Sequence, residues 1–412
     1  MTALNRRVHV TALAALLAAG CSATDDAGEG VVVRDTVLVR AASVDTVQIV
    51  ENPAAPAMLA EWSVSAQPEI DLGGPDAPED EALFRVASAY RLSDGRIIVA
   101  DGGSTSLKVF GPAGDLMGAI GRPGEGPGEF RGLNHVALLP GDSIAVWDFS
   151  QARLTVFDAA GVVGREVRIG ATPASPRSNV IGVFADASLL AQDFIRLVDG
   201  VPQGLVRHSV GAFHLSPAGL LVDSLDAITT GESWFVERNG GFSVFTPPFA
   251  RATSILAAGE HLITGDTERP EIRVFSADGT PHRLVRWVPQ PRLISAADID
   301  NARSHAIGDN PTDDHRTNID RMFAEMRMPT AMPAFGLLRV DVDGNLWATD
   351  YRTEWDEADI AWTVFAVDGR MIARLSMPGR FRPTHIGRDF VLGITQDEFD
   401  VEHVQLFSLA RD

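Results

Sequence analysis

The stretch RIIVADGGSTSLKVFGPAG, residues 96–114, decides the fold. An apolar run ends in Asp101, a short loop follows, and a second run ends in Phe110, four residues before Gly114. Short apolar runs bounded by turn residues predict strands, and glycine accepts the positive φ of a tight turn. The stretch therefore predicts two antiparallel strands and a hairpin turn into a third.

The same pattern recurs four more times along the chain. In every copy the first run ends in aspartate, and the second run ends in a large apolar residue with glycine at the fourth position after it. The first runs end at Asp101, Asp148, Asp193, Asp266 and Asp350, and the turn glycines are Gly114, Gly161, Gly219, Gly279 and Gly369. Because the aspartates recur in each copy, we expect them to be structural and to accept loop N–H groups.

A sixth copy begins at Phe390–Ile394, but the sequence reaches Asp412 before its last strand. The closest copies lie 42 and 47 residues apart, which is typical of a four-stranded propeller blade. The spare strands Trp62–Val64 and Glu69–Leu72 precede the first copy and would complete the last one. We therefore predict an all-β, six-bladed β-propeller over residues 62–412, with an N-terminal strand closing the last blade. A β-sandwich, the alternative, leaves the spare strands unexplained.

The linker Gly121–Phe130, GRPGEGPGEF, carries the most specific resemblance. It resembles the blade linker of a group of bacterial six-bladed propeller lipoproteins, and the chain resembles NHL-repeat propellers from Trp62 onward. This resemblance implies the same fold and a cell-envelope location. It does not assign an activity.

The N-terminus predicts export. Arg6 and Arg7 precede the apolar run Val8–Leu17, and small residues lead to Cys21, the only cysteine in the chain. We predict a lipoprotein signal peptide at 1–21, lipidation of Cys21, and a tether and N-terminal extension over 22–61. The predicted location is the periplasm or outer membrane, with the anchored leaflet undetermined; ordinary cleavage with an incidental cysteine is the alternative. The strands expected in residues 31–50 could extend a blade edge.

The amino-acid composition limits which classes of molecule the protein can be expected to bind. The formal net charge is -20, which argues against nucleic acid, because phosphates require clustered Lys and Arg. The predicted contact with a membrane is through the lipid anchor only. A single cysteine excludes an intramolecular disulfide, so stability must come from sheet packing and ring closure.

Insertions are predicted to gather on one face of the propeller, where blade linkers and the loops between second and third strands emerge. The longest insertion spans about 291–331 and reads as two helices, with Ser295 capping the first. In the second, Met322, Phe323 and Met326 belong to one apolar stripe. The stripe either packs on the propeller as structural core or forms a lid over the central channel.

Two histidines, His135 and His385, each follow a Phe-Arg pair at the expected start of an innermost strand. Both are therefore candidates to face the channel mouth, where histidines could bind Ca²⁺ or Zn²⁺, although no cofactor is required and the identity of any metal stays unknown. The other reading is that they are isolated polar residues.

No catalytic residue is predicted, and no motif requires an enzyme. The favoured function is a binding or interaction module of the cell envelope, whose elaborated face holds an unidentified small molecule, glycan or protein. The alternative is a metal-dependent hydrolase or lyase with its site at the channel mouth.

Overall fold

The computed structural model describes residues 38–41, 47–54, 59–170, 179–194, 204–238, 241–289, 292–308, 311–353 and 355–411. The predicted signal peptide and Cys21 lie outside the described residues. Within the described ranges, no helix is long and apolar enough to cross a membrane.

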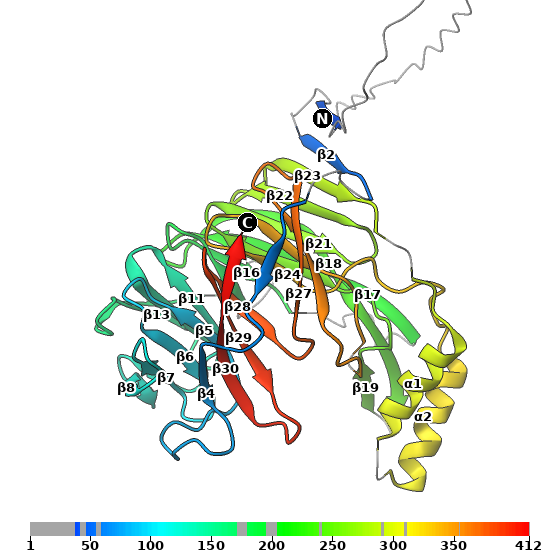
Figure 1. The fold of residues 1–412 in the computed structure, drawn as a ribbon, viewed down its shortest axis with the longest axis horizontal. Helices are drawn as coiled ribbons and strands as arrows, with labels where there is room; N and C mark the ends of the chain where they lie inside the picture. The colour runs from blue at the N-terminus through cyan, green and yellow to red at the C-terminus, as the bar shows by residue number, and fades with distance from the viewer. Residues whose placement is uncertain are drawn as a thin grey trace, which may run out of the picture. The chain divides into compact units, whose positions relative to one another are not determined.

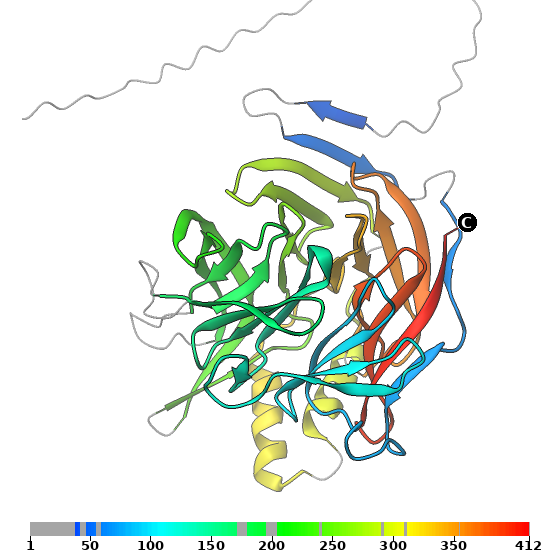
Figure 2. The ribbon, with the colours of Figure 1, turned by 90° about the vertical axis from the view of Figure 1, so that its left-hand side faces the viewer.

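Six sheets follow one another along the chain, and Figure 2 shows them arranged radially in chain order. Blade 1 consists of β5 (Val86–Arg91), β6 (Ile97–Asp101), β7 (Ser106–Phe110) and β8 (Leu116–Ile120). Blade 2 consists of β11 (His135–Leu139), β12 (Ser143–Asp148), β13 (Arg153–Phe157) and β14 (Val163–Arg168). Blade 3 consists of β15 (Asn179–Val183), β16 (Leu189–Gln192), β17 (Gly204–Leu215), β18 (Leu221–Arg238) and β19 (Gly241–Phe245).

The second half of the ring continues the same order. Blade 4 consists of β20 (Thr253–Ala258), β21 (His261–Asp266), β22 (Glu271–Ser276) and β23 (Pro281–Trp287). Blade 5 consists of β24 (Leu338–Val340), β25 (Leu346–Thr349), β26 (Ile360–Phe365) and β27 (Met371–Met377). Blade 6 consists of β28 (Arg382–Ile386), β29 (Phe390–Gln396) and β30 (Glu402–Arg411), completed by β3 (Trp62–Val64) and β4 (Ile70–Gly73). The linker between blades 1 and 2 holds the short parallel pair β9 (Arg122–Pro123) and β10 (Glu129–Phe130).

The ring closes as predicted. Both β3 and β4 pair antiparallel with β30, so the leading segment supplies the outer strand that the last blade lacks. Six apolar clusters each join two neighbouring blades, and the one between blades 6 and 1 contains Leu72, Phe110 and Leu406. Apolar packing therefore continues through the closure, so burial of apolar surface as well as strand pairing holds the first and last blades together.

The segment that leads into β3, together with β3 itself, binds the outside of the ring. We call residues 47–54 and 59–64 the N-terminal strap. Here β2 (Gln48–Asn52) pairs with β23 in parallel and with β1 (Leu38–Ala41) on its other side, which extends the edge of blade 4. The N–H of Ala60 then donates to the carbonyl of Ile372 in blade 5, and β3 reaches blade 6. Figure 2 shows the blue β2 beside the edge of blade 4. The strap thus crosses three consecutive blades.

The five recurring glycines lie in the turns between third and fourth strands, with φ from 75° to 91°, as the sequence predicted. These turns define the plain face. The opposite, elaborated face is where innermost strands begin and where blade linkers emerge.

The helical insertion follows β23. It contains α1 (Ala296–Ile307) and α2 (Asp313–Glu325), shown in yellow in Figure 1. The hydroxyl of Ser295 accepts from the N–H of Asp298, whose carboxylate accepts from the N–H of Ser295 in return. This capping box confirms the predicted start of the first helix.

Candidate functional site

The innermost strands β5, β11, β15, β20, β24 and β28 enclose the ring centre, and neighbouring strands pack against each other from β28 through β5, β11, β15 and β20 to β24. Their ionisable side chains, apart from Tyr90, are all basic: Arg91, His135, Arg339, Arg382 and His385. None of the six strands contains Asp or Glu, although acidic residues outnumber Lys and Arg by 55 to 35 in the chain. The strands around the ring centre of this acidic protein therefore contribute positive charge and no negative charge.

Two of these arginines lie next to each other on neighbouring blades. Arg339 of β24 donates from Nε to the carbonyl of Pro383 at 2.8 Å, directly beside Arg382 of β28. Burial lowers the pKa of the Arg339 guanidinium, and the positive charge of Arg382 lowers it further. In the described part of the chain, neither arginine forms an ion pair with a carboxylate. The pair is an uncompensated double positive charge.

The two predicted histidines lie at different depths. His135 is the first residue of β11 and pairs with the fifth residue of β12. In blade 6 the equivalent place belongs to Arg382, because it pairs with the fifth residue of β29, whereas His385 pairs with the third. His385 therefore lies two residues further from the elaborated face, or about 7 Å at about 3.3 Å per residue. The expectation that both histidines start their strands holds for His135 and is wrong for His385.

Both imidazoles are neutral at physiological pH. Burial lowers the pKa of His135 to about 4, and burial together with Arg91 lowers the pKa of His385 to about 4. The Nδ1 of His385 already accepts the N–H of Arg91 at 3.0 Å, and its ring packs near Tyr90 and Phe390. Among the residues described, no three His, Cys, Asp or Glu side chains lie together in a way that could hold a metal.

A cavity of about 530 Å³ opens between blades 5 and 6 on the elaborated face; we call it the blade 5–6 pocket. Its apolar wall consists of Leu337, Ile360, Trp362, Phe381 and Ile394. Three arginines, Arg352, Arg380 and Arg382, line it as well. Since Arg382 also belongs to an innermost strand, the pocket adjoins the basic ring centre.

Two of the pocket arginines are held by the loop after β25. Arg352 donates to the carbonyl of Asp356 at 2.8 Å, and Arg380 forms an ion pair with Glu357. Burial lowers the pKa of Arg352, and the charge of Arg380 lowers it further. In contrast, Arg382 is exposed, and its guanidinium donates no hydrogen bond to any described residue. Among the three pocket arginines, Arg382 is thus the one available to a ligand.

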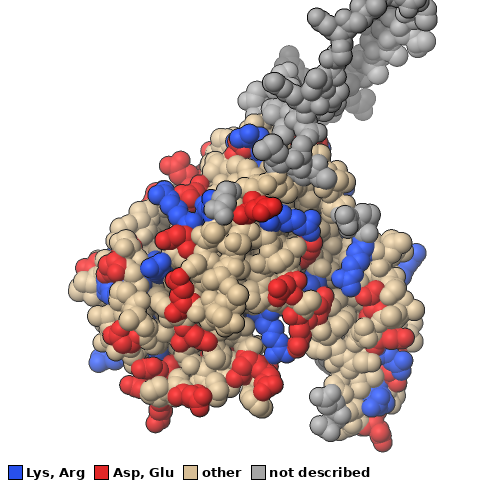
Figure 3. All heavy atoms as spheres, in the orientation of Figure 1, with Lys and Arg blue, Asp and Glu red and all other residues tan. Residues whose placement is uncertain are grey.

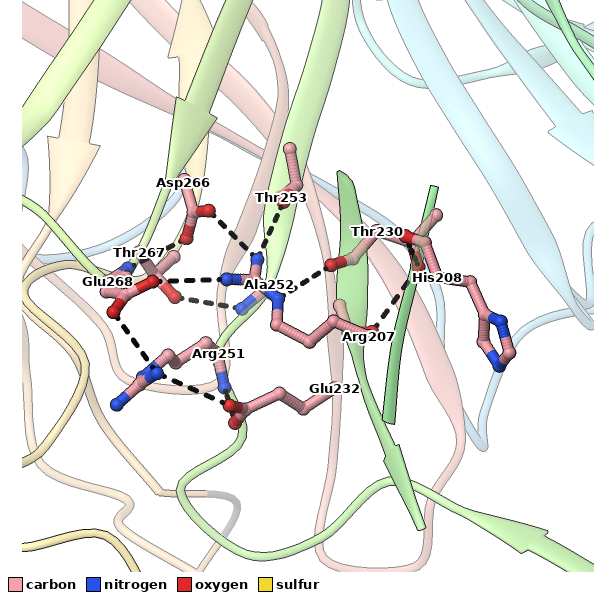
Figure 4. Close-up of polar contacts among 11 residues, drawn as sticks. Arg207, His208, Thr230, Glu232, Arg251, Ala252, Thr253, Asp266, Thr267 and Glu268 are labelled. Carbon is pink, nitrogen blue, oxygen red and sulfur yellow. Dashed lines mark hydrogen bonds and ion pairs between the residues drawn. The ribbon is translucent and has the colours of Figure 1, made fainter. Parts of the chain in front are cut away.

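A second cavity, of about 740 Å³, lies between blades 3 and 4 and is bordered by the charged network in Figure 4. Arg207 of β17 binds Asp266 at 2.9 Å and Glu268 at 3.3 Å, while Arg251 binds Glu268 and Glu232. Each charged group in this network has an opposite partner. The network therefore clamps the long β17–β18 hairpin onto blade 4, and a ligand would have to break it to bind there.

The helical insertion reaches the blade 5–6 pocket through its first helix. His305 of α1 lines the pocket, whereas Phe323 of α2 packs in an apolar cluster around Phe249 and Ala302. Met326 is buried just past the end of α2, and Met322 is half-buried. Figure 3 shows a notch between the insertion and the body of the propeller. The apolar stripe thus contributes to structural packing, and its role as a lid stays a prediction.

The recurring aspartates divide into two groups. Asp101 and Asp148 accept backbone N–H groups of the loop before their innermost strand, at 2.9 and 2.6 Å, as expected. In blades 4 and 5 a threonine hydroxyl accepts the corresponding loop N–H group. The carboxylates of Asp266 and Asp350 bind arginine side chains. The predicted acceptance of loop N–H groups is therefore confirmed for Asp101 and Asp148, and also for Asp266, which accepts the N–H of Glu268 at 2.9 Å. The carboxylate of Asp350 binds Arg374 instead.

Comparison with known proteins agrees with this architecture. Residues 78–171 match the family model DUF5128, described as a 6-bladed beta-propeller. The chain is a six-bladed β-propeller. No curated protein matches its sequence.

Solved structures similar to this propeller share little sequence with it. A Bacteroides fragilis protein assigned as exported is 12% identical, with a TM-score of 0.47, covering 88% of this chain and 99% of that one. A DUF4221 member from Bacteroides vulgatus is 10% identical, with a TM-score of 0.46, covering 86% and 100%. A gluconolactonase of Xanthomonas campestris is 12% identical, with a TM-score of 0.42, covering 87% and 99%.

Proposed function

We propose that the protein is an exported, lipid-anchored binding module that holds a small ligand in the blade 5–6 pocket. The pocket itself carries the proposal. At about 530 Å³ it lies within the size range of small-molecule sites, it has an apolar wall, and a few hydrogen-bond donors converge on it. The N-terminal sequence supports the anchored location, because Cys21 follows an apolar run and small residues.

The placement of the pocket suits binding from solution. It opens on the elaborated face, beside the loop after β25 and the insertion helix α1, and these irregular segments stand on a closed, rigid ring. Binding residues are commonly carried by loops on such scaffolds. The hydrogen bond from Arg352 to the carbonyl of Asp356 and the ion pair between Arg380 and Glu357 fix the shape of the wall without a ligand.

A filled-pocket variant tests the proposal. Leu337 lines the pocket with 40% of its surface exposed, so Leu337→Trp should fill the cavity with little effect on the core. Val342→Trp is the matched control, because Val342 is 54% exposed and follows β24 at the plain face. The probe is 2-naphthalenemethanol, a neutral aromatic molecule, and its affinity is measured by isothermal titration calorimetry.

We expect the native protein and Val342→Trp to bind this probe alike, and Leu337→Trp to bind it at least about tenfold more weakly, a difference of about 1.4 kcal/mol. Absence of binding to the native protein, or equal loss in both variants, would contradict the proposed site.

A further inference from the structure

We infer that the blade 5–6 pocket selects a small amphipathic anion, whose carboxylate or similar acidic group binds between Arg382 and Arg339. This inference rests on the proposed function, because it takes the pocket as the ligand site and names the chemical class of the ligand. The observation behind it is the juxtaposition of two arginines that have no carboxylate partner.

Placing two arginines side by side has an electrostatic cost. Arg339 is half-buried, its Nε and Nη1 donate to the carbonyls of Pro383 and Leu338, and Arg382 is its charged neighbour. Two like charges in a partly buried place repel each other more strongly than they do in water. An anion between them would turn this repulsion into two favourable interactions.

Few negative charges lie around the two arginines. The innermost strands contain no Asp or Glu, so these strands contribute no carboxylate to the wall of the ring centre. The pocket wall contains two, Asp400 and Glu402, and the Glu402 carboxylate accepts the N–H of Val86 at 2.9 Å. Neither carboxylate forms an ion pair with Arg382 within the described residues. A ligand is therefore left to supply the negative charge.

The guanidinium of Arg382 has the geometry that recognition of an anion requires. A guanidinium presents several N–H donors in one plane and binds carboxylate, phosphate or sulfate oxygens in pairs. Arg382 offers all of its donors, since it donates to no described residue, and it faces the apolar wall that includes Leu337 and Phe381. An acidic group bound at Arg382 would thus leave the apolar part of the same molecule in the pocket.

The test compares two probes of nearly equal shape, 2-naphthoate and the neutral 2-naphthalenemethanol, by calorimetry on the full folded protein. We expect naphthoate to bind at least about tenfold more tightly than the alcohol. In Arg382→Gln this preference should disappear, with the affinity for the alcohol unchanged. Arg388→Gln is the matched control, because it removes the same charge from blade 6 at an exposed site paired with Asp343, and should change neither affinity.

The outcomes separate the two proposals. If the alcohol binds in the pocket and naphthoate binds no better, the anion inference fails while the proposed function stands. If neither probe binds, both fail. If naphthoate is preferred equally by the native protein and Arg382→Gln, the assignment to these arginines is overturned.

A second measurement uses inorganic phosphate, which needs no apolar wall. We expect it to raise the melting temperature of the native protein and of Arg388→Gln, but not that of Arg382→Gln, because a ligand that binds only the folded state stabilises it. Equal shifts in all three proteins would contradict an anion site at Arg382.

Discussion

Replacing Asn52 with alanine should loosen the N-terminal strap and lower the stability of the propeller. The side chain of Asn52 is buried at the end of β2 and joins three segments of the chain. Its amide donates to the carbonyls of Arg286 in blade 4 and Gly369 in blade 5, at 3.0 and 2.9 Å. Its carbonyl oxygen accepts the N–H of Met371 at 2.7 Å.

The magnitude follows from these three hydrogen bonds. Alanine removes all three and leaves three backbone groups without partners, and each orphaned buried group costs about 1–3 kcal/mol. Water can reach part of this outer edge, so we place the total loss near the lower end, at about 3 kcal/mol. The change Asn52→Asp should cost at least as much, because it replaces two donors with a charge that faces two carbonyl oxygens.

The assay is urea unfolding together with amide hydrogen exchange of β2, which reports release of the strap even when the ring stays folded. The control is Asn301→Ala, the same substitution at an exposed position in α1. A loss within about 0.5 kcal/mol of the control, with unchanged exchange of β2, would refute the reasoning, since substitutions that break no contact fall within this range.

Three further predictions follow from single residues. Cys21→Ser should abolish palmitate labelling and move the protein from the membrane to the soluble fraction, and retention in the membrane would exclude this anchor. Gly369→Ala should lower the free energy of unfolding by about 1–3 kcal/mol more than the control Gly141→Ala. Both glycines have positive φ, but only at Gly369 would a Cβ lie within 3.1 Å of other side chains. Equal losses of stability in the two variants would contradict this reasoning. The pKa of His385, lowered to about 4 by burial and Arg91, should give an NMR titration midpoint near pH 4. Stability should then fall as pH drops from about 6.5 toward 4, because the unfolded chain binds this proton first; a midpoint near 6.5 would contradict burial.

The anion inference gives the ring centre a physical role that the two histidines do not have. His385 is neutral and already accepts a hydrogen bond, so it adds polarity without charge. The arginines add charge without a compensating partner. A ligand entering from the elaborated face therefore meets the positive pair at Arg382 before it reaches His385, which lies three residues further along the same strand.

Part of the site was within reach of the sequence. His135 and His385 were correctly assigned to innermost strands, but the depth of His385 depends on a register shift in β28 next to Pro383, which no pattern in the sequence marks. The sequence does hold a signal for Arg339 and Arg382: the innermost strands contain arginines but no Asp or Glu.

The sequence by itself determined the number of blades, the closing strand and the start of the first helix. Each of these depends on a short-range pattern: alternating apolar residues, a glycine that accepts positive φ, or a capping serine. Such local patterns can be recognised from the sequence alone. Only the tertiary structure decided which charges meet. Arg339 and Arg382 lie on different blades, and closing the ring brings them together without any local motif. Side-chain juxtaposition depends on register and blade order, which are properties of the assembled sheets rather than of any one segment.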